Sequence, residues 1–168
     1  MNNLEFLVRM ERLFRLLQFT MVDDRLVQVC TYMRQLIFRY CCCVRSGFDD
    51  LAAICAKKAA ETYCNMINER TGNKELWSLH ELIEELPLWS KGPPHNMVTN
   101  ARLSAMLVHN GGDAEWWLQG CRYYGNIGAH SELPARHTDI EDCTISVQMV
   151  CAGVYAWVRA LAMNASKL

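Results

Sequence analysis

Apolar residues recur at intervals of three and four along most of the chain, which is the pattern of amphipathic helices, and no alternation of apolar and polar residues marks a strand. Two such segments open the sequence, over residues 4–21 and 26–40. Asp23 and Asp24 lie between them, where an aspartate can cap the second helix. The pattern predicts an N-terminal helical hairpin over residues 1–45. The hairpin either packs on the other helices or offers a surface for dimerisation or for a protein partner.

Capping motifs predict where three later helices begin. Ser46-Gly47-Phe48-Asp49 has the form of a capping box and opens a third helix that Thr71-Gly72 ends. Its predicted buried side consists of Leu51, Ile54, Cys55, Ala59, Thr62, Tyr63, Met66 and Ile67. Ser78-Leu79-His80-Glu81 opens a short helix that ends near residue 86. Thr138-Asp139-Ile140-Glu141 opens a final helix that continues to about residue 162.

The segments between these boxes complete the predicted architecture. Residues 87–95 contain three prolines and a glycine and are expected to form a loop. A fifth helix is expected over 96–109, a sixth from about 113 to 130, and a polar connection over 131–137. The whole chain, 1–168, is therefore predicted to be a single all-α domain, an antiparallel up-and-down helical bundle of about six to seven helices.

Composition and charge narrow the class of protein. A chain with 51% hydrophobic and 21% charged residues has a globular composition. Its net charge of −1 leaves no global attraction for nucleic acid, so any contact with RNA must be local. The nine cysteines are odd in number, three are adjacent, and no secretory signal precedes them, which predicts reduced thiols in a cytoplasmic protein. Charges interrupt the apolar N-terminal run, which predicts an amphipathic helix and no membrane span.

The segment 121–130 contains the residues best suited to chemistry. In a helix, Arg122, Asn126 and His130 form a polar stripe within about 80° of arc. The guanidinium of Arg122 suits a phosphate, and His130 can transfer a proton near neutral pH. Together they could cleave RNA without a metal: the imidazole takes the proton of a ribose 2′-hydroxyl while the guanidinium stabilises charge on the phosphate. Asn126 would orient the reacting groups.

One such pair per chain makes half of an acid–base set, which predicts a homodimer with paired sites across a two-fold axis. Gly125 and Gly128 fit a close approach, either to a neighbouring helix or to a ligand. The structural alternative assigns these glycines to packing, pairs Arg122 with Glu115 or a helix end, and makes His130 a helix cap.

Nearby residues add further candidates. Trp116, Trp117, Tyr123 and Tyr124 could stack on RNA bases, although aromatic residues at these spacings commonly fill a core. Arg136 and His137 are further RNA-binding candidates, and His137 could supply a second imidazole. Cys121, His130, His137 and Cys143 are residue types that bind zinc, but they lack the short paired spacings of structural zinc sites. No metal and no cofactor are therefore expected.

The pattern Arg122-x-x-Gly125-Asn126-x-x-Ala129-His130, followed by a capped final helix, resembles the HEPN superfamily of helical, nucleotide- or RNA-associated domains. It is most similar to a bacterial branch of uncharacterised domains with an R-x-x-G-N-x-x-A-H signature. The resemblance covers about residues 48–163 and leaves out the N-terminal hairpin.

The resemblance implies a bundle of four to five core helices, frequent dimerisation and, in catalytic members, metal-independent ribonuclease activity. Many members act in toxin–antitoxin pairs, restriction or antiviral defence. Here seven residues separate Arg122 from His130, more than in most active members, and Tyr123 replaces a polar residue. Two hypotheses follow: a dimeric RNA-binding or RNA-cleaving protein of bacterial or phage conflict, or a non-catalytic HEPN-like module that binds or inhibits a protein partner.

Overall fold

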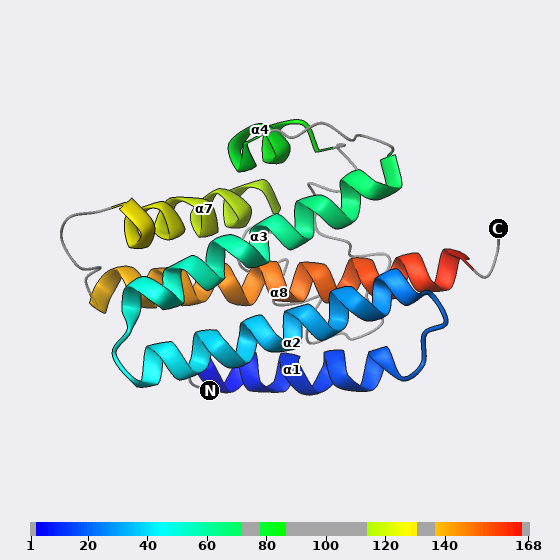
Figure 1. Ribbon diagram of the computed structural model, residues 1–168, viewed down its shortest axis with the longest axis horizontal. Helices are drawn as coiled ribbons and strands as arrows, with labels where there is room; N and C mark the ends of the chain where they lie inside the picture. Colours follow the sequence, from blue (N-terminus) through cyan, green and yellow to red (C-terminus); the bar gives the residue numbers. More distant parts are fainter. Residues whose placement is uncertain (1–2, 72–77, 87–113, 131–136, 166–168) are drawn as a thin grey trace.

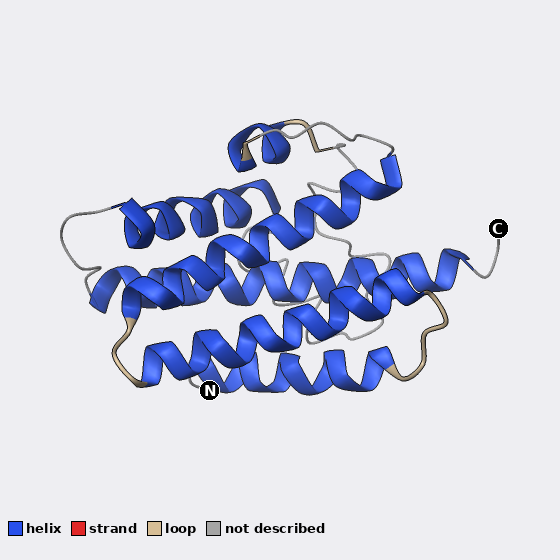
Figure 2. Cartoon of the chain, viewed as in Figure 1, coloured by secondary structure: helices blue, strands red, loops and turns tan. Residues whose placement is uncertain are grey.

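The computed structural model describes residues 3–71, 78–86, 114–130 and 137–165, and within them the protein is an all-α bundle with no strand (Figures 1 and 2). The described helices are α1 (Asn3–Gln18), α2 (Asp24–Arg45), α3 (Asp49–Thr71), α4 (Leu79–Glu84), α7 (Ala114–His130) and α8 (His137–Ala165). The predicted 87–95 loop, the 96–109 helix and residues 131–136 of the predicted 131–137 connection lie outside the described residues, and residue 137 belongs to α8 instead.

The helices form layers, with α3 and α8 between the α1–α2 hairpin and the pair α4 and α7 (Figure 1). In this view α1, α2 and α3 run in alternating directions, and α7 runs opposite to α8. The helical hairpin predicted from the N-terminal pattern is confirmed.

Two predicted N-terminal caps are confirmed by their hydrogen bonds. The Asp23 carboxylate accepts from the backbone N–H groups of Arg25 at 2.9 Å and Leu26 at 3.2 Å, at the start of α2. The Ser78 hydroxyl accepts from the backbone N–H of Glu81 at 3.3 Å, at the start of α4. In each case a side-chain oxygen accepts from backbone N–H groups of the first helical turn, which have no acceptor within the helix itself.

The predicted box at Ser46–Asp49 is wrong, because Ser46, Gly47 and Phe48 end α2 and Ser46 does not cap α3. Ser46 is the C-cap, the N–H of Gly47 bonds to Val44 O at 3.2 Å, and the N–H of Phe48 bonds to Cys43 O at 2.8 Å. This is a Schellman motif, and Gly47 supplies its left-handed residue with φ +76°. The helix α3 then begins at Asp49. At the other box, α8 begins at His137, so Thr138 lies inside the first turn.

The predicted buried face of α3 is partly wrong, because Leu51 is 54% exposed. The predicted burial of Ala59, Tyr63, Met66 and Ile67 is confirmed. The helix also buries small residues that were not predicted, namely Ala52, Ala53, Ala56 and Ala60. Alanines bring neighbouring backbones close, whereas a leucine at these positions would hold them apart.

The central helix of the bundle is α8, whose residues 146–158 are all buried. A helix that is apolar on all sides belongs inside a core. By length and composition the stretch Asp139–Ala162 could also cross a membrane, but 78% of its most apolar window is buried within the protein. Burial among the other helices accounts for its composition.

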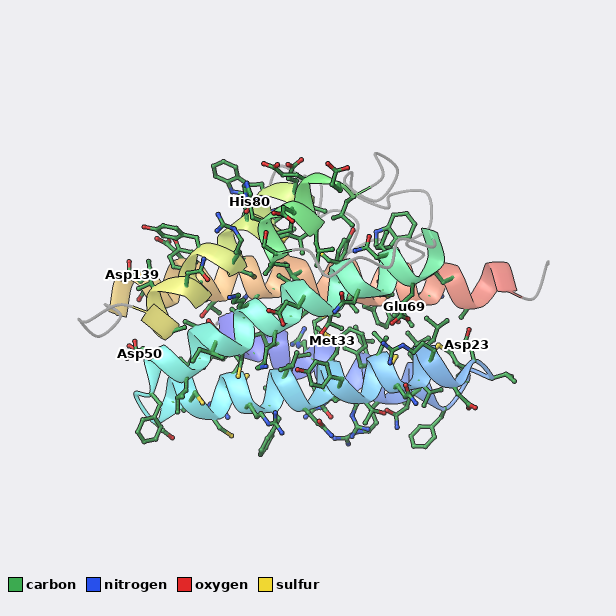
Figure 3. The ribbon with its side chains drawn as sticks, turned by 45° about the horizontal axis from the view of Figure 1, so that its top comes forward. Asp23, Met33, Asp50, Glu69, His80 and Asp139 are labelled. Carbon is green, nitrogen blue, oxygen red and sulfur yellow. The ribbon has the colours of Figure 1, made fainter. Side chains whose placement is uncertain are left out.

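The N-terminal hairpin packs directly on α8. The rings of Phe14 and Tyr155 meet edge to face with centroids 5.7 Å apart. The Tyr40 hydroxyl, on α2, lies 2.6 Å from the hydroxyl of Thr144, on α8. A bidentate ion pair joins Arg25 of α2 to Glu69 of α3, at the end of the bundle where Figure 3 labels Asp23 and Glu69. Hairpin and remaining helices thus share one core.

All nine cysteines are free thiols, and Cys30, Cys41, Cys64, Cys121, Cys143 and Cys151 are buried. Burial raises the pKa of each of these six thiols, because the thiolate loses its hydration in the apolar interior. Inert, protonated core thiols are the result.

Candidate functional site

The helix α7 presents two faces of different character. Leu118, Cys121 and Gly125 are buried, whereas Arg122 and Asn126 are partly exposed and Tyr123 is 57% exposed. The inward face packs on α3 and α8, and the outward face carries Arg122 and Asn126, the first two residues of the predicted polar stripe.

The glycines of α7 serve contacts within the chain. A Cβ atom on Gly125 would collide with the Lys57 side chain, and one on Gly128 would lie 2.7 Å from the carbonyl oxygen of Asp50. Both contacts are with α3. Of the two predicted uses for these small residues, the described structure shows close approach to a neighbouring helix.

A surface pocket of about 600 Å³ lies between α7 and α8, a volume typical of small-molecule sites. Its α7 wall is formed by Trp116, Trp117, Gln119, Gly120, Arg122, Tyr123 and Tyr124, and its α8 wall by Asp142, Ile145 and Ser146. Glycine at position 120 lets α7 approach α8 closely, because a Cβ atom at this position would lie 2.5 Å from the Ser146 hydroxyl.

The four aromatic residues of this segment differ in how far they are buried. Trp116 is 72% exposed, and Trp117 and Tyr124 are partly exposed. The rings of Tyr123 and Tyr124 meet edge to face at 5.3 Å. The expectation that these residues fill a core is wrong for Trp116 and Tyr123, whereas Trp117 and Tyr124 are partly buried against the core. The exposed rings of Trp116 and Tyr123 leave ring faces available for stacking. The indole N–H of Trp117 is buried and has no acceptor among the described residues.

Four side chains from α4 and α7 form a hydrogen-bonded chain that ends at Arg122. The Glu84 carboxylate lies 3.0 Å from His80 Nε2, and His80 Nδ1 lies 3.3 Å from Gln119 Nε2. Gln119 Oε1 then accepts from Arg122 Nε at 2.6 Å. Figure 3 labels His80 on α4, beside α7. His80 and Glu84 lie one helical turn apart on α4, and their contact is the first part of this chain.

Donor and acceptor roles along the chain follow from arginine, which can only donate. Gln119 must therefore present its oxygen to Arg122 and its NH₂ group to His80. His80 Nδ1 must then be an acceptor, which assigns the neutral Nε2–H tautomer that donates to Glu84. With Nε held by Gln119, the two terminal NH₂ groups of Arg122 have no hydrogen-bond partner among the described residues.

The pocket also contains negative charge. The pKa of Tyr124 is raised first by burial and then by the nearby Asp142 carboxylate, because both disfavour the phenolate. Guanidinium and carboxylate thus lie in one pocket, on different helices.

The described structure brings together part of the predicted site. Arg122, Tyr123 and Tyr124 line the pocket, whereas Asn126 is partly buried on the same helix and is not among the lining residues. The backbone of His130 ends α7 and that of His137 begins α8, but their side chains lie outside the described residues, as does all of Arg136.

Sequence reasoning missed the roles of Gln119 and Asp142. Gln119 lies one helical turn before Arg122, and this spacing could have indicated the hydrogen bond. Asp142 comes from another helix, so no local pattern places it beside Arg122.

The four residues considered for zinc do not form a described site. Cys121 and Cys143 are buried core residues, and the described side chains contain no group of three metal-binding residues.

Comparison of the chain with known protein families, with curated proteins and with solved structures finds no match.

Proposed function

We propose that this chain is a cytoplasmic, HEPN-like protein that binds unpaired RNA at the α7–α8 pocket. The observation that carries the proposal is the position of Arg122 in one pocket with the exposed rings of Trp116 and Tyr123. A guanidinium binds phosphate oxygens bidentately, and flat aromatic faces stack on bases of any sequence. Sites for single-stranded RNA combine these two elements.

Residues 48–163 would be the HEPN-like core, with the antiparallel up-and-down arrangement of that superfamily, and residues 1–45 an added hairpin. In the catalytic form of the proposal the protein is a homodimer. Arg122 binds the scissile phosphate, His130 exchanges the proton of the 2′-hydroxyl, and Asn126 orients the groups. Its setting would be bacterial or phage conflict.

Binding is tested first. Fluorescence anisotropy with a labelled single-stranded RNA should show a weaker complex for Arg122→Gln and a salt dependence whose slope falls by about one. Arg12→Gln is the matched control, because it removes the same charge from an exposed position on α1, across the bundle. Equal affinities for the wild type and Arg122→Gln would refute the proposed site.

Cleavage is tested separately, with a pool of labelled RNA in EDTA and the molecular mass measured alongside. Products formed by the wild type and absent with His130→Ala would establish a metal-independent ribonuclease that depends on His130. If the folded wild type binds RNA but does not cleave it, the catalytic form of the proposal is excluded and the RNA-binding form still stands.

A second candidate is the non-catalytic module that binds a protein partner, and exposed apolar side chains on the hairpin favour it. Phe19 is 78% and Val22 96% exposed in the α1–α2 connection, and Leu16 is exposed just before it. Failure of the wild type to bind RNA would favour this function. Loss of a captured partner with Phe19→Ser, but not with Tyr123→Ser, would then locate the interface on the hairpin.

A further inference from the structure

Asp142 is an unusual neighbour for a phosphate-binding arginine. Its side chain is exposed in the wall opposite α7, and no described cation forms an ion pair with it. A carboxylate repels an RNA backbone, so it opposes binding wherever it has no hydrogen-bond donor to contact. The donors that unpaired RNA can offer are the 2′-hydroxyls and the N–H groups of the bases.

The Watson–Crick edges of the four bases differ in how they meet a carboxylate. Guanine presents two adjacent donors, N1–H and N2–H, which match the two carboxylate oxygens. Adenine and cytosine each present one amino group beside a ring-nitrogen acceptor, and uracil presents one N–H between two carbonyl oxygens. In a bidentate contact, only guanine satisfies both oxygens without placing an acceptor against the negative charge.

We propose that Asp142 makes this pocket selective for an unpaired guanine, which stacks on the aromatic wall while Arg122 holds an adjacent phosphate. The inference rests on the proposed function and adds a base preference to it. Three features support it: the pocket holds a ligand of nucleotide size, its aromatic residues are exposed, and its two charges come from opposite walls.

The test compares short oligouridines that carry one central G, A or C, with affinities measured by fluorescence anisotropy. The wild type should bind the G-containing RNA about tenfold more tightly than the A- or C-containing ones, the discrimination expected of one good bidentate contact. Asp142→Asn keeps the size of the side chain and removes its charge, and it should reduce the preference to about twofold or less.

Glu141→Gln is the matched control, because it removes the same charge from the adjacent exposed residue of α8, which does not line the pocket. It should keep the full preference for G. Equal affinity of the wild type for all the RNAs, or an unchanged preference in Asp142→Asn, would overturn the guanine assignment and leave RNA binding intact. Loss of the proposed function gives a different result, namely no binding to any of the RNAs.

Discussion

Gln119 and Arg122 lie one turn apart on α7, and Oε1 of Gln119 accepts a hydrogen bond from Nε of Arg122 at 2.6 Å. The other end of the same amide faces Nδ1 of His80 at 3.3 Å. A single amide therefore links α4 to the arginine of the pocket. Because it holds only Nε, it orients the guanidinium without using its terminal NH₂ groups.

Gln119→Leu should weaken RNA binding about two- to tenfold, because Arg122 loses the hydrogen bond that orients it. Anisotropy with single-stranded RNA measures the change, and thermal unfolding checks that stability changes by no more than about 0.5 kcal/mol, as expected for a residue near the surface. In an Arg122→Gln background, Gln119→Leu should have no further effect. An equal loss with and without Arg122 would show that Gln119 acts independently of it.

Thr144→Val should destabilise the protein more than Tyr40→Phe. The Thr144 hydroxyl already donates to Ile140 O at 2.7 Å, so Tyr40 must donate to Thr144. Removal of Thr144 takes the oxygen acceptor from a buried hydroxyl and should cost about 1–3 kcal/mol, whereas removal of the tyrosine hydroxyl should cost about 0.5–1.5 kcal/mol. Urea unfolding of both variants measures the difference. The reverse order would contradict the assigned direction of this bond.

Gly128→Ala should destabilise the contact between α7 and α3. The new methyl group would lie 2.7 Å from the Asp50 carbonyl oxygen and 2.9 Å from the Ala53 side chain, so a backbone must move. Overpacking of this kind costs about 1–3 kcal/mol, or roughly 2–12 °C in melting temperature for a chain of this size. Ala129→Ser, at the adjacent exposed position, is the control and should change stability by less than about 0.5 kcal/mol.

Stability should fall in alkali. Burial raises the pKa of the Cys41 thiol to about 11 and that of Cys64 to about 12, from an ordinary value of 9.0. Below pH 9 these thiols are protonated in both folded and unfolded states. Between pH 9 and the folded-state pKa only the unfolded state loses the proton, so each thiol lowers the free energy of unfolding by about 1.4 kcal/mol per pH unit.

Urea unfolding from pH 7 to 11 in a reducing buffer measures this slope. Cys64→Ala should make the decrease in unfolding free energy with pH less steep, by about 1.4 kcal/mol per pH unit, because one buried thiol is removed. The variant also lowers stability at pH 7, because it loses packing. The same alkaline slope in wild type and Cys64→Ala would exclude Cys64 as a contributor.

Much of the secondary structure could be predicted because its causes are local. Asp23 and Ser78 cap helices through their own neighbours, and the helical period identified α1, α2 and α7 without reference to the rest of the chain. The same local reasoning failed at Ser46–Asp49. A Ser-x-x-Asp box and a Schellman motif both fit those four residues, and the length of α2 decides between them.

The sequence by itself determined an all-α chain and the helical spacing that sets Arg122 and Asn126 one turn apart on α7, since capping, helical period and side-chain chemistry depend on residues a few positions apart. Only the tertiary structure decided which side chains are exposed to solvent and which side chains of different helices contact each other. It exposed Leu51 because α3 buries its alanines, and it placed Trp116 in the open α7–α8 pocket because Gly125 and Gly128 turn another face of α7 toward α3. It also placed Asp142 in the pocket of Arg122, because two helices distant in sequence pack side by side, and only packing creates such a contact.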